Sequence, residues 1–246
     1  MEGVVRARRA GYRGAVDIRE YVPGAIWLAP YPVSLVGLRF EARMTIVRLD
    51  DGSLVVHSPG PIAAAERERM LALGRVALIL APGNFHHLHL RSCQRAFPDA
   101  ETWICPGVER KQRGLRFDGM LGERLPASMR AGFEQAFVQG RLMAEVPLLH
   151  RPTRTLLLVD LVERFGDGTP NVNPALRACW KLFGMWNHPA PAPEYRIAGW
   201  KDRAAARAAL ERVLGWDFER VVISHGELIE HDAKAIVRKA WRALLD

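Results

Sequence analysis

Three groups of side chains that commonly bind metal ions stand directly after predicted β-strands. They are the pair His86 and His87, then Asp160, then His225. Imidazole nitrogens together with a carboxylate oxygen are ligands suited to zinc, iron or manganese. A sheet holds the backbone rigid at the end of a strand, while the following loop opens the side chain to solvent. The sequence therefore predicts a metal site built from strand ends.

The predicted strands that position these residues alternate with predicted helices. The strands that precede the three groups cover residues 76–81, 155–159 and 221–224. Two further β-rich runs flank Asp50-Asp51-Gly52-Ser53, and Asp-Gly between such runs predicts a hairpin. Helices are expected over residues 62–73, 88–97, 127–138, 174–186, 201–214 and 231–245. This mixture predicts layers of helix packed against sheet.

The pattern predicts a single domain over residues 21–246, because no stretch of the chain has the composition of a linker. A basic lead-in is expected at residues 1–20. Within the domain, residues 165–200 form an irregular excursion rich in glycine and proline. Inside it, Trp180, Phe183 and Trp186 recur at three-residue steps and share one face of a predicted helix. This face is expected either to wall the site or to pack on the core or on a second subunit.

The arrangement resembles the metallo-β-lactamase superfamily. The opening hairpin, a helix and an apolar strand lead to the stretch APGNFHH at residues 81–87, where that family carries THxHxDH. A strand ending in a bridging aspartate matches LLLVD at 156–160, and a strand ending in a histidine ligand matches VVISHG at 221–226. With RMT-x-x-RL at 43–49, the chain resembles an uncharacterised bacterial branch with a degenerate motif. The resemblance implies a four-layer αββα sandwich of the α/β class with mixed sheets.

The departures from the family signature concern one of its two metal positions. Pro82 and Asn84 replace the first two histidines, and His86 replaces the aspartate, so that only His87 stands where a histidine is expected. A later family histidine has no counterpart, and the nearest stretch offers Arg141. The surviving set implies one divalent metal ion, expected to be zinc with iron or manganese as alternatives. Its implied ligands are His86, His87, Asp160 and His225.

Such a site implies hydrolysis by a metal-activated water. A metal that keeps a coordination position for water lowers the pKa of that water from 15.7 toward about 7. The resulting hydroxide would attack a small ester, thioester, lactone or phosphoester, with Asp160 as the expected catalytic residue that moves the proton and a free histidine as the alternative. We expect Asn84, Arg141 and Trp186 to contact the substrate, because the arginine fork suits an anion and the tryptophan would exclude water.

Two other classes of function stay open at this point. The degraded signature fits a non-catalytic relative that binds a small molecule or a protein partner in the former cleft. The net charge of +8 would suit nucleic-acid processing, but the positive residues are spread along the chain rather than clustered, which disfavours it. Metal content separates the hydrolase from the non-catalytic relative.

The remaining expectations concern location and partners. No apolar run approaches the roughly 18 residues of a membrane helix, and no signal-peptide pattern follows the arginine-rich start. We therefore expect a cytoplasmic protein with a small-molecule substrate and without a membrane partner, and a homodimer is left open. Cys93, Cys105 and Cys179 form no CxxC pair, which disfavours a thiolate zinc knuckle.

Overall fold

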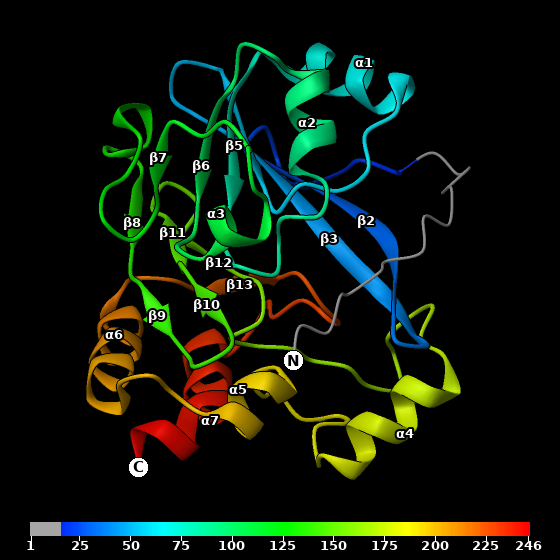
Figure 1. Ribbon diagram of the computed structural model, residues 1–246, viewed down its shortest axis with the longest axis vertical. Helices are drawn as coiled ribbons and strands as arrows, with labels where there is room; N and C mark the ends of the chain where they lie inside the picture. The colour runs from blue at the N-terminus through cyan, green and yellow to red at the C-terminus, as the bar shows by residue number, and fades with distance from the viewer. Residues whose placement is uncertain (1–15) are drawn as a thin grey trace.

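In the computed structural model, which describes residues 16–246, most strands belong to two mixed β-sheets (Figure 1). The seven strands of the first sheet lie in chain order: β1 (Arg19–Val22), β2 (Ile26–Leu35), β3 (Leu38–Arg48), β4 (Leu54–His57), β5 (Val76–Ala81), β6 (Glu101–Ile104) and β7 (Gly119–Met120). Strands β1 to β4 pair antiparallel, and β4 to β7 pair parallel. The predicted hairpin is confirmed, since Ile46 of β3 pairs with Val56 of β4.

The second sheet contains the strands that precede Asp160 and His225. Its spatial order is β13 (Arg220–Ile223), β12 (Thr155–Leu158), β11 (Leu148–His150) and β8 (Phe133–Gln135). Strands β12 and β13 run parallel, whereas β11 is antiparallel to both β12 and β8. A separate antiparallel pair consists of β9 (Val138–Gln139) and β10 (Ala144–Glu145).

Helices cover the outer faces of the two sheets. They are α1 (Ala64–Leu73), α2 (Leu90–Ala96), α3 (Val108–Lys111), α4 (Pro174–Leu182), α5 (Pro193–Ala198), α6 (Arg203–Gly215) and α7 (Ala233–Leu245), with a 3₁₀ turn at Ala127–Met129. Figure 1 shows α1 and α2 at one end of the molecule and α6 and α7 at the other. No helix within residues 16–246 combines the length and the apolar character needed to cross a bilayer.

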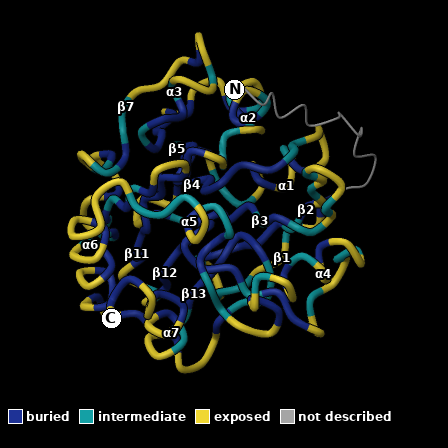
Figure 2. The backbone as a smooth tube through the Cα atoms, turned by 60° about the horizontal axis from the view of Figure 1, so that its bottom comes forward, coloured by how far each residue is buried: buried dark blue, intermediate teal, exposed yellow. Residues whose placement is uncertain are grey.

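Alternating side chains of the second sheet build two cores. Leu148, Leu157 and Val222 lie side by side in register and belong to the core shared with the first sheet. Their neighbours Leu156 and Val221 point to the other face and pack with α6 and α7. The strands are accordingly buried while the outer helix faces are exposed (Figure 2). The order of layers is helix, sheet, sheet, helix, which confirms the predicted αββα sandwich.

The helix predicted over residues 127–138 is wrong. After the short 3₁₀ turn, Phe133, Glu134 and Gln135 form β8 and pair with the buried strand β11. Gly132 precedes this strand, and a glycine weakens a continuing helix by about 1 kcal/mol relative to alanine. Packing of Phe133 into the core and pairing with β11 outweigh the helical composition, as tertiary context often does for short segments.

The predicted lead-in covers residues 1–20, of which residues 1–15 lie outside the described part of the chain. Val16 is already buried, and its backbone N–H donates to Glu66 Oε1 at 2.7 Å. Strand β1 then begins at Arg19. Packing against the first sheet therefore starts before residue 21.

Candidate metal centre

The ends of three strands bring His86, Asp160 and His225 together. Strands β12 and β13 are parallel neighbours, so Asp160 and His225 leave the second sheet at the same edge. His86 comes from the loop that follows β5 in the first sheet. A bridge from Gly83 to Glu145 ties the start of that loop to β10. The cluster therefore lies where one edge of each sheet meets.

The three side chains are in direct contact with one another. Asp160 Oδ1 lies 3.2 Å from His86 Nε2 and 3.5 Å from His225 Nε2. One potential ligand atom from each residue lies within 4.8 Å of the other two. The side chains are only 6%, 8% and 9% exposed for His86, Asp160 and His225, respectively. The imidazole and carboxylate atoms thus converge on one buried point.

The outer nitrogen of each imidazole ring has its own partner. His86 Nδ1 lies 2.6 Å from Ser58 Oγ, and His225 Nδ1 donates to the backbone carbonyl of Glu41 at 3.3 Å. A metal-ligating histidine characteristically makes such a bond with its second nitrogen, which fixes the tautomer and the ring plane. Arg43 in turn holds the His225 loop, because its guanidinium donates to the carbonyl oxygens of Ile223 and Gly226.

The tautomer of His225 favours a cation between its ring and the Asp160 carboxylate. A carbonyl oxygen can only accept, so His225 carries its proton on Nδ1. Burial lowers the pKa of His225 to about 4, against the opposing effect of Asp160, and the ring is neutral at neutral pH. Its Nε2 then presents a lone pair to the Asp160 carboxylate at 3.5 Å. Two facing lone pairs repel, whereas a cation between them would bind both.

The separations fit a tetrahedral metal ion. Zinc bonds of about 2.0–2.2 Å to nitrogen and oxygen place neighbouring tetrahedral ligand atoms about 3.4 Å apart. The two distances from Asp160 Oδ1, 3.2 Å and 3.5 Å, bracket that value. Two imidazoles and one carboxylate also form a ligand set that divalent zinc, iron and manganese accept. The described residues therefore fit a divalent metal ion.

Asp160 is oriented by Glu145, which the sequence analysis did not identify. The buried Glu145 carboxylate accepts hydrogen bonds from the backbone N–H groups of Val159, Asp160 and Leu161 at 2.7–2.8 Å. Burial, and then the charge of Asp160, raise the pKa of Glu145 to about 7, while these three bonds oppose the rise. The sequence did contain a signal, because Glu145 is the one charged residue in the otherwise apolar stretch at residues 142–149.

A second buried acid, Glu163, faces the same region. Burial, and next the charge of Asp160, raise the pKa of Glu163 well above its usual value. Its Oε2 atom has no hydrogen-bond partner within residues 16–246. The backbone of Glu163 pairs with Ala190 in the excursion that covers this edge. Burial and the charge of Asp160 therefore both favour the neutral form of Glu163.

Lys111 brings a positive charge to the loop of His86. Its Nζ donates to the carbonyl of Asn84 at 2.8 Å and lies over the Phe85 ring. Burial lowers the pKa of Lys111 to about 8, and the Asp160 carboxylate opposes that effect. No pattern in the sequence distinguished Lys111, because α3 and the His86 loop meet only in the folded chain.

The structure does not bring the other predicted site residues into the cluster. His87 points away from it, and its Nδ1 lies 2.9 Å from Gln112 Nε2, because adjacent residues of the loop project in different directions. Asn84 uses its amide to bind the backbone of Leu142 and Ala144. These bonds make Asn84 a brace between two loops.

Arg141 and Trp186 also have partners elsewhere. Arg141 is exposed and donates to the carbonyl of Trp200. Trp186 is buried in a third apolar cluster with Phe165 and Trp180, and its indole N–H donates to Asp167 at 3.2 Å. Packing is thus the observed role of the predicted aromatic face.

The third apolar cluster extends to the metal centre and covers it. Phe40 packs against this cluster, and its ring meets the His225 ring edge-on at a centroid distance of 5.2 Å. Phe165 contacts Phe40 in the same way at 5.9 Å. Phe40 of β3, backed by Phe165 of the excursion, therefore shields the His225 side of the cluster from water.

Solved structures with the same arrangement decide the fold. A metallo-β-lactamase from Pontibacter korlensis is 12% identical, with a TM-score of 0.62, over 94% of this chain and 100% of that one. A metallo-β-lactamase from Hirschia baltica is 10% identical, with a TM-score of 0.62, over 94% of this chain and 98% of that one. This chain has the metallo-β-lactamase fold.

Another metallo-β-lactamase of this fold, FIM-1 from Pseudomonas aeruginosa, was solved in its mono-zinc form. It is 10% identical, with a TM-score of 0.61, over 95% of this chain and 98% of that one. The family model "Domain of unknown function (DUF4336)" matches residues 23–108. No curated protein matches the sequence. At these identities the likeness shows the metallo-β-lactamase fold but not the reaction, which has to be inferred from the residues of the site.

Proposed function

We propose that this chain binds one divalent metal ion through His86, Asp160 and His225 and hydrolyses a small ester, thioester, lactone or phosphoester. Zinc is the metal proposed first, with iron and manganese as alternatives. The observation that carries the proposal is the convergence of His86 Nε2, Asp160 Oδ1 and His225 Nε2, with Asp160 Oδ1 3.2 Å and 3.5 Å from the two ring nitrogens. The mono-zinc form of the fold neighbour FIM-1 supports a single-metal site in this fold.

A set of three protein ligands suits catalysis. When bound, the metal would supply Lewis acidity and lower the pKa of a coordinated water toward about 7. Three protein ligands leave the fourth position that catalytic zinc sites keep open. Ser58 and the Glu41 carbonyl hold the two imidazole rings, and Glu145 fixes the backbone of Asp160. The chain's own contribution is therefore a rigid set of ligands.

Two further side chains have pKa values that the charge of Asp160 shifts. Burial and the charge of Asp160 favour the neutral form of Glu163, so Glu163 is the proton donor for the leaving group in this proposal. Lys111 is positive and faces Asp160, so it stabilises negative charge that develops on the substrate. Lys111 thus takes the part that the sequence analysis assigned to Arg141.

The low exposure of the cluster favours one alternative, a non-catalytic relative that binds a small molecule. The ligand side chains are at most 9% exposed, and the aromatic rings of Phe40 and Phe165 cover one side. A substrate would reach the metal only if the covering excursion moved, as lids do in many enzymes. A protein whose excursion stays closed would retain the metal without turnover.

A hydrolysis screen tests the proposed reaction. Zinc-loaded protein is offered a chromogenic ester, thioester, lactone and phosphodiester, beside Asp160→Asn and the control His87→Ala, which alters a histidine outside the cluster. We expect activity on at least one class, lowered about 100-fold or more by Asp160→Asn and little by His87→Ala. Metal-loaded, folded protein that hydrolyses none of the four would contradict the hydrolase and favour the non-catalytic relative.

A further inference from the structure

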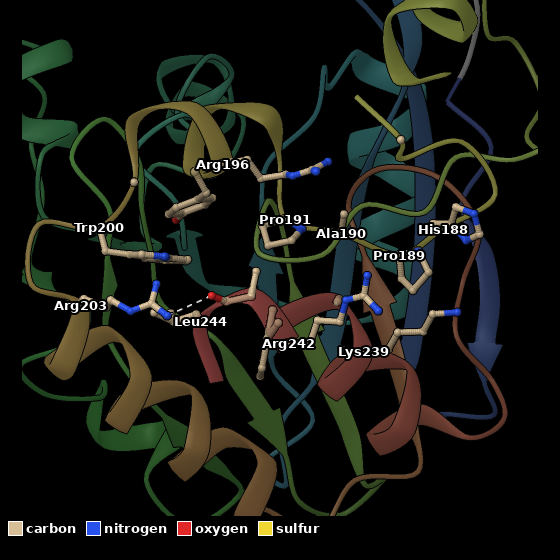
Figure 3. A pocket seen from close by; sticks show the side chains of 16 residues that line it. His188, Pro189, Ala190, Pro191, Arg196, Trp200, Arg203, Lys239, Arg242 and Leu244 are labelled. Atoms are coloured by element: carbon tan, nitrogen blue, oxygen red, sulfur yellow. Dashed lines mark hydrogen bonds between the residues drawn. The ribbon is translucent and has the colours of Figure 1, made fainter. Parts of the chain in front are cut away.

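A cavity of about 660 Å³ lies between α7 and the segment 184–203, and none of the metal-centre residues lines it (Figure 3). That volume is in the range of pockets that hold small molecules. Part of its wall is apolar and comes from Pro189, Pro191 and Leu244. Another part carries basic side chains and is formed by His188, Arg196, Arg203, Lys239 and Arg242.

The basic side chains of this cavity have no carboxylate partner in the described part of the chain. Elsewhere in residues 16–246, arginines such as Arg154, Arg177 and Arg207 pair with carboxylates. None of the ion pairs in that part of the chain includes a basic residue of the cavity, and no acidic residue is among the described residues that line it. The cavity thus concentrates positive charge without an internal counter-ion.

Backbone carbonyls hold two of the guanidinium groups in place. Arg203 donates to the carbonyl of Ala243 at 3.0 Å, and Arg196 donates to the carbonyl of Phe183 at 2.7 Å. Each guanidinium has five N–H donors, so donors remain for another partner. Figure 3 shows Arg242 and Lys239 reaching from α7 below the loop that carries Pro189 and Pro191. The basic groups therefore approach the cavity from several elements.

An aromatic wall lies next to the basic groups. The Trp200 ring stacks on Tyr195, with the ring centroids 5.0 Å apart and 24° between the planes. Tyr195 is itself fixed, because its ring lies against Gly140, where a side chain would collide with it. In Figure 3 the indole of Trp200 lies just above the guanidinium of Arg203. A ligand with a flat ring next to an anionic group could therefore pack its ring on Trp200 and place its anionic group beside Arg203.

We propose that this cavity is a binding site for a small phosphate monoester or phosphonate that carries an aromatic ring. A monocarboxylate would neutralise only one of the four arginine and lysine charges. A phosphate monoester carries about −1.5 to −2 at neutral pH and offers three acceptor oxygens, which matches several arginine forks at once. The ring would pack on Trp200 and the proline-rich wall. This site is independent of the metal-centre proposal.

Titration calorimetry with phenylphosphonate tests the site, because this ligand has no ester bond to hydrolyse. The protein is metal-free Asp160→Asn, which removes anion binding to a metal. Arg242→Gln is compared with Arg238→Gln, a neighbour on α7 that does not line the cavity. Both variants remove one exposed charge from the same helix, so net charge and folding are matched.

We expect saturable binding of one phenylphosphonate per chain, weakened about tenfold or more by Arg242→Gln and within about twofold of the parent in Arg238→Gln. Benzoate, the matched carboxylate, should bind more weakly than phenylphosphonate. The absence of saturable binding at millimolar phenylphosphonate would overturn the proposal. Equal weakening by the two variants would also overturn it, since diffuse surface charge would then explain the binding.

Discussion

The carboxylate of Glu145 accepts a hydrogen bond from the backbone N–H of Asp160 at 2.7 Å, and the same oxygen accepts from Leu161. The other carboxylate oxygen accepts from Val159. Three donors on one buried carboxylate leave the loop little freedom, so the direction of the Asp160 side chain is fixed before any metal arrives. A preformed ligand set binds its ion without the entropy loss of ordering a loop.

Glu145→Gln should weaken both the fold and metal binding. The carboxamide offers one acceptor oxygen, and its NH₂ group would face a backbone donor, which leaves a buried N–H unpaired. We expect the free energy of unfolding to fall by about 1–3 kcal/mol in urea titrations of the metal-free protein. The control Glu134→Gln changes a partly exposed acid paired with Arg151 and should alter stability by less than about 1 kcal/mol. Equal effects would contradict the role of Glu145.

Ser58→Ala should lower metal affinity and leave the fold nearly unchanged. The hydroxyl lies 2.6 Å from His86 Nδ1, and removing it frees the ring to rotate and to change tautomer. Loss of such a second-nitrogen partner weakens metal binding about 10- to 100-fold. Competition with a chromophoric chelator measures the change, with Ser92→Ala as the control because Ser92 binds a backbone carbonyl outside the cluster. Unchanged affinity in Ser58→Ala would show that Ser58 does not position His86.

Gly226→Ala should disrupt the loop that carries His225. Gly226 has a φ of +90°, and a Cβ there would collide with the backbone carbonyl of Arg164. We expect a loss of several kcal/mol in stability and of metal binding, because the backbone must move at the adjacent ligand. In the control Gly215→Ala, near the end of α6, the added Cβ meets no atom within 4 Å, and stability should change by less than about 1 kcal/mol. A stable, metal-binding Gly226→Ala would contradict this account.

His57 should make the fold acid-sensitive. Burial, and then the charge of His86, lower the pKa of His57 to about 3, and neither ring nitrogen has a hydrogen-bond partner within residues 16–246. Below about pH 6.5, the pKa of histidine in the unfolded chain, His57 is protonated in the unfolded state but stays neutral in the folded state. This group therefore lowers stability by up to about 1.4 kcal/mol per pH unit as the pH falls from about 6.5 toward 3, and contributes no pH dependence above that range.

Leucine in place of His57 should remove that part of the acid sensitivity. It also replaces a buried polar group that has no partner, so stability at pH 7 should stay equal or rise. Urea unfolding at pH 7 and pH 5 measures both effects, with exposed His231→Gln as the control. If His57→Leu unfolds with the same pH dependence as the parent, the histidine is not neutral in the fold.

The pattern of apolar runs and turns predicted helices packed against sheet, and the resemblance to the metallo-β-lactamase superfamily implied the αββα order of the layers. The continuous apolar run at 76–81 is the buried strand β5, and the Asp-Gly turn is the hairpin between β3 and β4. A helix was wrongly predicted over residues 127–138 because their composition suits one. The strand β11, which pairs with β8 in this segment, lies farther along the chain. Pairing between distant segments is a tertiary effect that local composition does not carry.

The metal centre was predictable only in part. Residues directly after strands meet because parallel strands end at one edge, and this placed Asp160 beside His225. Which of two adjacent histidines turns inward depends on the conformation of a loop, so His86 and His87 could not be separated. Lys111 meets the loop of His86 only because α3 packs against it, and the burial of Glu163 is likewise a tertiary effect, so only the folded chain shows them.

Metal content of the purified, untagged protein tests the central claim most directly. The acid digest is analysed by mass spectrometry for the parent, Asp160→Ala, His225→Ala and the control His87→Ala, each after reconstitution with zinc and removal of free ion. We predict about one metal per chain in the parent and in His87→Ala, and almost none in the other two variants. A parent that takes up no metal, or an Asp160→Ala protein that keeps it, would contradict the metal centre.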